Sequence, residues 1–171
     1  MTDTRIEKLA ELLVNYSVKV KKGDKVAIQG ELGAEPLLKA IYVKILQAGG
    51  YPYLQASPSG ISELFFRHAS DDQLKHVAPP QKLIMETYDV RISIGGEENT
   101  RELSGIDPDR MVMCQQARTD IMKTFMERSA KGELRWTYAL FPTNAYAQDA
   151  EMGLSEYEDF VYQSCLGDIS D

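Results

Sequence analysis

Cysteine and histidine are scarce in this 171-residue sequence, which has only Cys114, Cys165, His68 and His76. Two cysteines so far apart exclude a disulfide framework and a Cys-x-x-Cys metal site. The histidines are eight residues apart, which is about 12 Å on a continuous helix and too far for two ligands of one ion. We therefore expect reduced thiols, with Cys114 buried on an apolar helix face, histidines at the surface or at helix caps, and no metal ligand.

The sequence also lacks the short motifs that carry common catalytic chemistry. It contains no G-x-S-x-G, no H-E-x-x-H and no P-loop. The segment GELGAE has two residues between its glycines and lacks the G-x-G-x-x-G spacing that holds a pyrophosphate. No catalytic residue is therefore assigned within this chain.

Long apolar runs and excess positive charge are absent as well. The amino-terminal segment MTDTRIEKLAELLVNY is amphipathic and charged, which is typical of neither a signal peptide nor a membrane span. With 19 basic and 26 acidic residues the net charge is −7, which disfavours contact with a phosphate backbone. We expect a cytoplasmic protein that binds neither nucleic acid nor membrane.

What the sequence does contain is an alternation of strand-like and helix-like segments. Apolar residues repeat every three or four positions over residues 3–17, which predicts an amphipathic helix. Short segments rich in β-branched, aliphatic and aromatic residues predict four strands, at 25–29, 51–55, 90–94 and 134–141. Helices between strands give parallel pairing. The fold class is α/β, a mostly parallel open sheet of about four strands with helices on both faces, in one domain over residues 1–171.

Several local features follow from periodicity and capping rules. A helix after Pro36 is expected to bury Leu46, and one continuous helix over residues 107–127 is expected to bury Met122. S-x-x-[EQ] patterns predict capping boxes at Ser70 and Ser155. Gly153 is expected to end the short helix that precedes it in the chain. Trp136, in the middle of an apolar strand, is expected to be largely buried.

Ligands of open parallel sheets bind at the carboxyl ends of the strands. Glu31 is the one carboxylate that remains a candidate site residue there, because it lies between two glycines. Ordinary turn geometry is the alternative explanation for such glycines and prolines. The predicted binding surface consists of Glu31, Gly95, Gly96, Pro142, Thr143, Asn144 and Tyr146.

Three blocks of sequence carry a resemblance to a known family. The first is R-W-T-x-x-x-x-P-T-x-x-x-A-Q-x-A-x-M, from Arg135 to Met152, followed by SEYEDF. The others are VKVKKGDKVAIQGELGAEPLLKAIYVKILQAGGYP and SIGGEENTRELSGIDPDR. Together these blocks resemble the amino-terminal half of the M29 family of metal-dependent aminopeptidases, the aminopeptidase T group.

The resemblance implies that the chain is the amino-terminal domain of a longer, dimeric enzyme that removes amino-terminal residues from peptides. It implies two divalent metal ions, zinc or cobalt, held by ligands beyond Asp171, so no ligand is carried over to this chain. The domain would help to wall the active-site cavity and support the homodimer, and would be inactive alone. Two alternatives remain open: a stand-alone module that binds a nucleotide or small molecule, and a purely structural or interaction domain.

Overall fold

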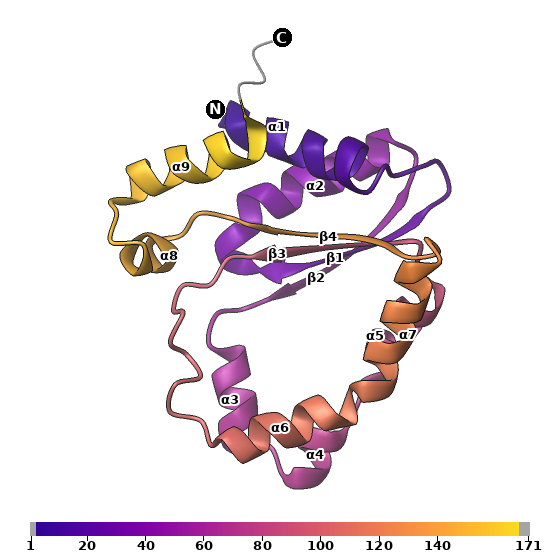
Figure 1. The fold of residues 1–171 in the computed structure, drawn as a ribbon, viewed down its shortest axis with the longest axis vertical. Coiled ribbons are helices and arrows are strands. Elements are labelled where there is room, and N and C mark those ends of the chain that lie inside the picture. Colours follow the sequence, from indigo (N-terminus) through magenta and orange to yellow (C-terminus); the bar gives the residue numbers. More distant parts are fainter. Residues whose placement is uncertain (1–2, 168–171) are drawn as a thin grey trace.

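The computed structural model describes residues 3–167 and has a four-stranded parallel sheet at its centre (Figure 1). The strands are β1 (Lys25–Glu31), β2 (Tyr51–Ser57), β3 (Val90–Gly95) and β4 (Arg135–Leu140). Their order across the sheet is β2-β1-β3-β4, and each neighbouring pair is parallel. The α/β class and the parallel sheet predicted from the sequence are confirmed.

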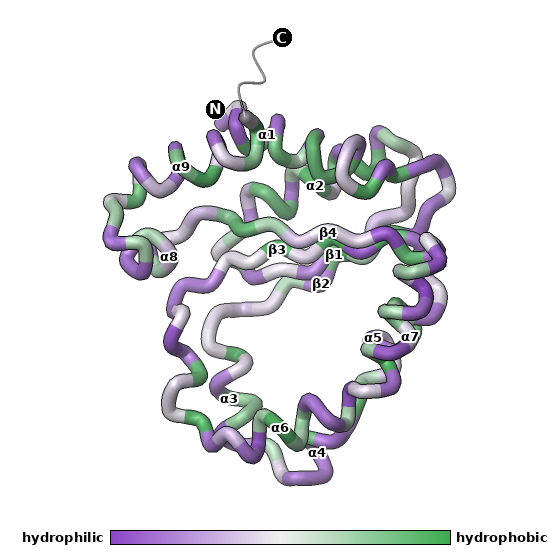
Figure 2. The backbone as a smooth tube through the Cα atoms, in the orientation of Figure 1, coloured by the Kyte–Doolittle hydropathy of each residue, from purple (hydrophilic) through white to green (hydrophobic). Residues whose placement is uncertain are grey.

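Three helices cover one face of the sheet: α1 (Thr4–Glu11), α2 (Glu35–Gln47) and α9 (Leu154–Leu166) (Figure 1). A π-helical segment, Leu12–Ser17, continues α1. Apolar positions recur along α1 and α2 beside the sheet (Figure 2). The main core lies in this layer, and its most completely buried side chains include Leu9, Leu37, Ile41, Ile28 and Ile92.

The remaining helices lie towards the other face of the sheet or beyond its ends (Figure 1). They are α3 (Ile61–His68), α4 (Asp71–Lys75), α5 (Pro79–Thr87), α6 (Pro108–Ala117), α7 (Thr119–Ala130) and α8 (Asn144–Asp149). A small second cluster of Met85, Phe125 and Leu134 holds α5 and α7 against the start of β4. This face is covered less completely, so polar strand residues on it can meet a ligand. Within residues 3–167, no helix is long and apolar enough to cross a membrane.

Arg135, at the start of the R-W-T segment, has a structural role. Its Nη2 lies 2.5 Å from Asp24 Oδ2, and its Nη1 donates hydrogen bonds to the backbone carbonyls of Val18 and Lys19. Both charged side chains are mostly buried, and the planar guanidinium suits several fixed acceptors at once. Arg135 therefore ties β4 to the turn before β1.

The prediction that Trp136 is largely buried was wrong. Its side chain is 53% exposed, and its ring meets the edge of Phe125 at a centroid distance of 5.6 Å. β4 is an edge strand, and Trp136 lies on its less covered face. Strand propensity could predict the strand, but not which face of it the helices would cover.

Three expectations about helix faces and ends were also wrong. Leu46 and Met122 are 53% and 52% exposed. Helical periodicity locates an apolar stripe, but it does not determine how much of that stripe packs against the rest of the protein. The helix expected over 107–127 divides into α6 and α7 at Arg118, whose ψ of 3° is not helical.

The two predicted capping boxes had different outcomes. At Ser70 the box with Gln73 is confirmed, with both reciprocal hydrogen bonds present. At Ser155 it was wrong, because α9 begins at Leu154 with Gly153 as its N-cap, so Ser155 already lies inside the helix. Gly153 therefore starts α9 and does not end α8, whose C-cap is Ala150.

Candidate functional site

The less covered face of the sheet carries a row of polar side chains. On β1, Val26 and Ile28 belong to the core below the helices, so Gln29 points to the other face because strand side chains alternate. Gln29 pairs with Gln55 on β2 and Ser93 on β3, and Ser93 pairs with Tyr138 on β4. Residues paired in parallel strands share a face, so these four side chains form one polar row.

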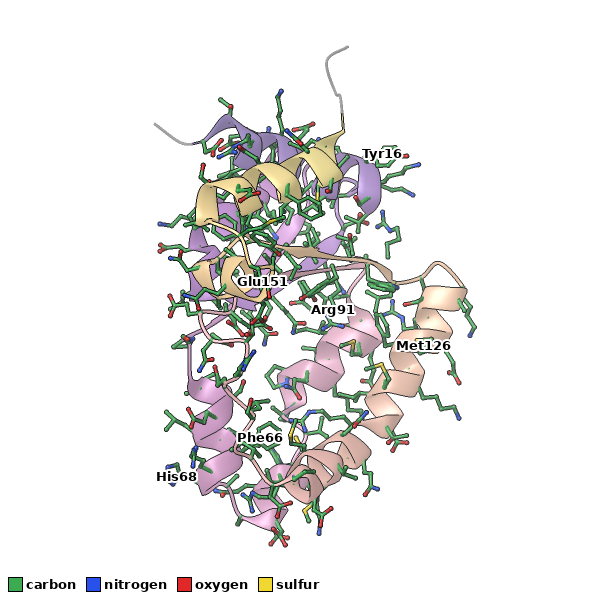
Figure 3. The ribbon with its side chains drawn as sticks, turned by 60° about the vertical axis from the view of Figure 1, so that its left-hand side comes forward. Tyr16, Phe66, His68, Arg91, Met126 and Glu151 are labelled. Carbon is green, nitrogen blue, oxygen red and sulfur yellow. The ribbon has the colours of Figure 1, made fainter. Side chains whose placement is uncertain are left out.

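Arg91 lies two residues before Ser93 on β3, so its side chain is on the same face of the sheet as this row. Its Nε donates a 2.7 Å hydrogen bond to Gln29 Oε1, and Gln29 Nε2 donates a 2.7 Å bond to Gln55 Oε1. The guanidinium carbon lies 5.7 Å from the centre of the Phe125 ring. Burial lowers the pKa of the Arg91 guanidinium, but an arginine stays charged in proteins. Figure 3 shows Arg91 between the sheet and the helices below it.

Carboxylate side chains gather at the carboxyl ends of the strands, whereas Arg91 lies near the amino end of β3. Glu31 ends β1, and Glu97 and Glu102 follow β3. Burial is the main cause that raises the pKa of Glu31, and the negative charges of Glu97, Glu102 and Glu98 raise it further. Glu102 is already engaged, because it accepts hydrogen bonds from the backbone N–H groups of Gly60 and Glu63, at 3.1 and 2.9 Å.

These residues line a cavity of about 420 Å³ over the sheet. Its wall opposite the strands includes Gln81 of α5, whose buried Oε1 has no hydrogen-bond partner within residues 3–167. A smaller hollow of about 210 Å³ adjoins it and shares Glu31, Glu97 and Glu102. The cavity therefore has a cationic end, a polar floor and an anionic end, an arrangement suited to holding a small polar molecule.

Tyr146 of α8 holds the loop after β3 in place. Its hydroxyl donates a hydrogen bond to Glu97 Oε2, and Thr143 Oγ1 donates one of 2.7 Å to the Glu97 carbonyl. Burial and the hydrogen bond to Glu97 raise the pKa of Tyr146 well above its ordinary value. The phenol thus stays a donor at physiological pH, and Glu97 keeps a fixed position at the anionic end.

The structure divides the predicted binding surface into three groups. Glu31 and Gly95 line the cavity, and Tyr146 reaches it through Glu97. Pro142 and Thr143 are buried, and Thr143 caps α8 through a 3.4 Å bond from the Tyr146 N–H. These two residues fit the turn explanation that the sequence left open.

The other two residues of that surface lie apart from the cavity lining. Gly96 packs against Ala34, and Asn144 is exposed. Sequence reasoning missed the polar row itself. The available signal was a polar residue at alternate positions of otherwise apolar strands, as at Gln29, Gln55, Arg91 and Ser93.

Neither histidine contributes to this cavity. His68 and His76 are both exposed, as expected, and line a separate hollow of about 460 Å³ between α3 and α4. Within residues 3–167, no three His, Cys, Asp or Glu side chains converge closely enough to hold a metal ion. The side chains that line this cavity therefore do not fit the metal pair of an aminopeptidase.

The raised pKa of Glu31 predicts a stability effect. A carboxylate whose pKa is higher in the folded chain favours folding only below its unfolded pKa, and this contribution is lost as pH rises through the folded pKa. Glu31→Gln should therefore raise the melting temperature at pH 7.5, by about 1 to 3 °C after allowing for its partial exposure. The gain should vanish only well below the ordinary glutamate pKa of 4.5, near about pH 3, where Glu31 is protonated in both the folded and the unfolded chain.

Thermal denaturation followed by circular dichroism at pH 7.5 and near about pH 3 checks this prediction. Glu156→Gln is the matched control, because Glu156 is an exposed carboxylate on α9. Its melting temperature should stay within about 1 °C of the wild type, as for most surface substitutions. A Glu31→Gln variant that is less stable at pH 7.5 would contradict the proposed repulsion.

Comparisons with known proteins agree with the fold described above. Wild-type AmpT from Thermus thermophilus matches with a TM-score of 0.75 and 18% identity, covering 95% of this chain and 42% of that chain. The chain thus spans less than half the length of AmpT. CurK enoyl reductase has 14% identity, coverage of 92% and 57%, and a TM-score of 0.33, too low to indicate a shared fold. A comparison with curated proteins finds no match.

The family comparison covers nearly every residue. A family model described as thermophilic metalloprotease (M29) matches residues 2–171. Its extent agrees with the three sequence blocks, which lie in the β1–β2 unit, around the end of β3, and across β4, α8 and α9. The chain therefore belongs to the M29 family of thermophilic metalloproteases.

Proposed function

We propose that this chain is the amino-terminal domain of a cytoplasmic, homodimeric, metal-dependent aminopeptidase. The observation that carries the proposal is the family match over residues 2–171, together with a fold that covers only 42% of the AmpT chain. The metal ligands of the whole enzyme would lie in a second domain. Two metal ions there, zinc or cobalt, would supply an activated water for peptide hydrolysis.

The role proposed for this domain is to form part of the wall of the active-site cavity. The carboxyl edge of the sheet carries the polar cavity, with Arg91 at one end and Glu31 and Glu97 at the other. Side chains on a rigid sheet can position a substrate without taking part in bond breaking. The domain alone would be inactive, and its other surfaces would support the dimer.

The nucleotide-binding alternative has less support than the peptidase. Glu31, Glu97 and Glu102 all line the cavity, and their negative charges would repel a phosphate group. A cavity with both charge signs instead suits a molecule that carries both an amino group and a carboxylate.

The proposed function is tested by peptide hydrolysis. This 171-residue chain should not hydrolyse leucine p-nitroanilide, whereas the full-length protein should do so when supplied with Zn²⁺ or Co²⁺. In the full-length protein, Tyr146→Phe should lower kcat/KM by roughly fivefold, because one hydrogen bond to Glu97 is worth about 1 kcal/mol.

Tyr42→Phe is the matched control, because Tyr42 is an exposed tyrosine on α2, on the other side of the sheet. Its kcat/KM should equal that of the wild type. If Tyr146→Phe, Asn144→Ala and Glu31→Ala all have the same kcat/KM as the wild type, this edge of the sheet has only a structural role. A full-length protein without peptidase activity in the presence of either metal would overturn the function itself.

A further inference from the structure

The two ends of the cavity present opposite charges that the protein itself leaves unpaired. Within residues 3–167, Arg91 makes its hydrogen bond through Nε, and no carboxylate lies close enough to shift its pKa. The two terminal Nη groups of Arg91 remain available for a bidentate contact with a carboxylate. At the other end, burial and the negative charges of Glu97, Glu102 and Glu98 raise the pKa of Glu31, and no cation among residues 3–167 lowers it. Each end therefore lacks the counter-charge that a ligand can supply.

The separation of these charges sets the length of the ligand. The Arg91 guanidinium is held at the level of Gln29, and Glu31 follows two residues later on the same face of β1. Two strand residues correspond to about 6.6 Å. An extended peptide spans at most about 3.6 Å per residue, so a two-residue peptide lying along the floor has about the length of this strand spacing. A single amino acid spans less than this spacing, and a longer peptide extends past one end.

The walls between these ends provide hydrogen-bonding groups for a peptide unit. Ser93 and Tyr138 lie on the cavity floor, with Gln55 beside them. Gln81 lies in the opposite wall, and its unpartnered Oε1 could turn towards the cavity to accept an N–H. An unpaired buried amide oxygen costs about 1 to 3 kcal/mol, which a ligand N–H would relieve. A volume of about 420 Å³ is also within the usual range for small-ligand sites.

We propose that this cavity binds a dipeptide in extended, zwitterionic form, with its carboxylate on Arg91 and its amino group between Glu31 and Glu97. This proposal names the ligand class of the same surface. It rests on the proposed function only where it identifies the zwitterionic ligand as a peptide. In a peptidase, such a site would retain short substrates or products at the wall of the cavity. It would favour peptides of two residues over longer ones.

Isothermal titration of this 171-residue chain with Ala-Ala tests the proposal directly. We expect a dissociation constant in the millimolar range, which corresponds to a binding free energy of about 4 kcal/mol for this small, solvent-accessible ligand. N-acetyl-Ala-Ala and Ala-Ala-amide, which each lack one charge, should bind at least about tenfold more weakly. Alanine and tetra-alanine should also bind more weakly, because neither matches the spacing of the two ends.

A variant of the cationic end supplies the second measurement. Arg91→Met should bind Ala-Ala and Ala-Ala-amide equally weakly, because the group that distinguishes them is gone. Lys75→Met is the matched control, since it removes one positive charge from an exposed position on α4, and it should bind Ala-Ala like the wild type. Circular dichroism verifies that each variant is folded. If Arg91→Met does not fold, the blocked peptides still test the proposal on the wild-type chain.

The outcomes separate this inference from the proposed function. No heat of binding with Ala-Ala up to about 20 mM, well above the expected constant, would overturn the inference, as would equal binding of blocked and free dipeptides. Hydrolysis by the full-length protein would then still support the peptidase function. Conversely, this chain could bind Ala-Ala with the expected dependence on both charges while the full-length protein hydrolyses no peptide. That pair of results would retain the inference and overturn the function.

Discussion

Leu38→Ala is expected to destabilise the protein by about 3 to 4 kcal/mol, the usual cost of leaving a cavity in place of a buried leucine. Leu38 lies on α2, is 2% exposed, and packs against β1 in the main core. For a chain of this size the change corresponds to a fall in melting temperature of about 10 °C. Urea denaturation should show a lower midpoint with an unchanged slope.

Leu46→Ala is the matched control, because it makes the same substitution on the same helix. Leu46 is 53% exposed, so the cost should stay below about 1 kcal/mol. Sequence periodicity alone placed both leucines on one buried face and would predict similar losses. Equal destabilisation by the two substitutions would therefore contradict the packing of α2 described above.

Gly96→Ala is expected to cost about 2 to 3 kcal/mol or more, because the loops that follow β1 and β3 touch through their backbones. A Cβ on Gly96 would lie 2.7 Å from Ala34 Cβ and 2.8 Å from the Ala34 nitrogen. The opposing glycine is equally restricted, since a Cβ on Gly33 would lie 2.2 Å from the Gly96 carbonyl oxygen. Backbone cannot move aside as a side chain can, so the two loops must separate.

Gly105→Ala provides the comparison in a loop of similar character. A Cβ there would meet the end of the Arg67 side chain at an ordinary 3.7 Å, so the free energy of unfolding should change by less than about 0.5 kcal/mol. Chemical denaturation of both variants measures the difference. If Gly96→Ala is as stable as Gly105→Ala, the close approach of the two loops is wrong.

The Gly96 contact also connects stability with the cavity. Glu31 and Glu97 are neighbours of the two loops that meet at Gly33 and Gly96. Separating these loops would move the two carboxylates that form the anionic end. Loss of dipeptide binding should therefore accompany loss of stability in Gly96→Ala, whereas Leu38→Ala changes the opposite face of the sheet.

The order of strands and helices could be read from the sequence because local rules determine it. The strands at 25–29, 51–55, 90–94 and 134–141 all exist, with ends that shift by at most two residues. The capping box at Ser70 follows from neighbouring residues, whose hydrogen bonds depend on little else. Parallel pairing follows from the helical connections. Family membership was likewise evident in the order of residues from Arg135 to Met152.

Burial on each face was less predictable, because it depends on partners far away in the sequence. Trp136 and Leu46 have the composition of core residues, yet the helices that could cover them lie elsewhere. The division of residues 107–127 at Arg118 is another tertiary outcome, because α6 packs against α4 whereas α7 packs against α5. Arg118 donates a 2.9 Å hydrogen bond to the Cys114 carbonyl there and has a non-helical backbone.

From the sequence alone we could infer the α/β class, the four strands, the family and the candidacy of Glu31, since each depends on residues close together in the chain. The cavity that Glu31 shares with Arg91 arises only on folding, because strand order places β1 beside β3 and alternation turns both side chains to one face. Gln81 comes to the same cavity from a helix fifty residues after Glu31. A site built from three separate elements has no local signal in the sequence, because its geometry arises when those elements pack.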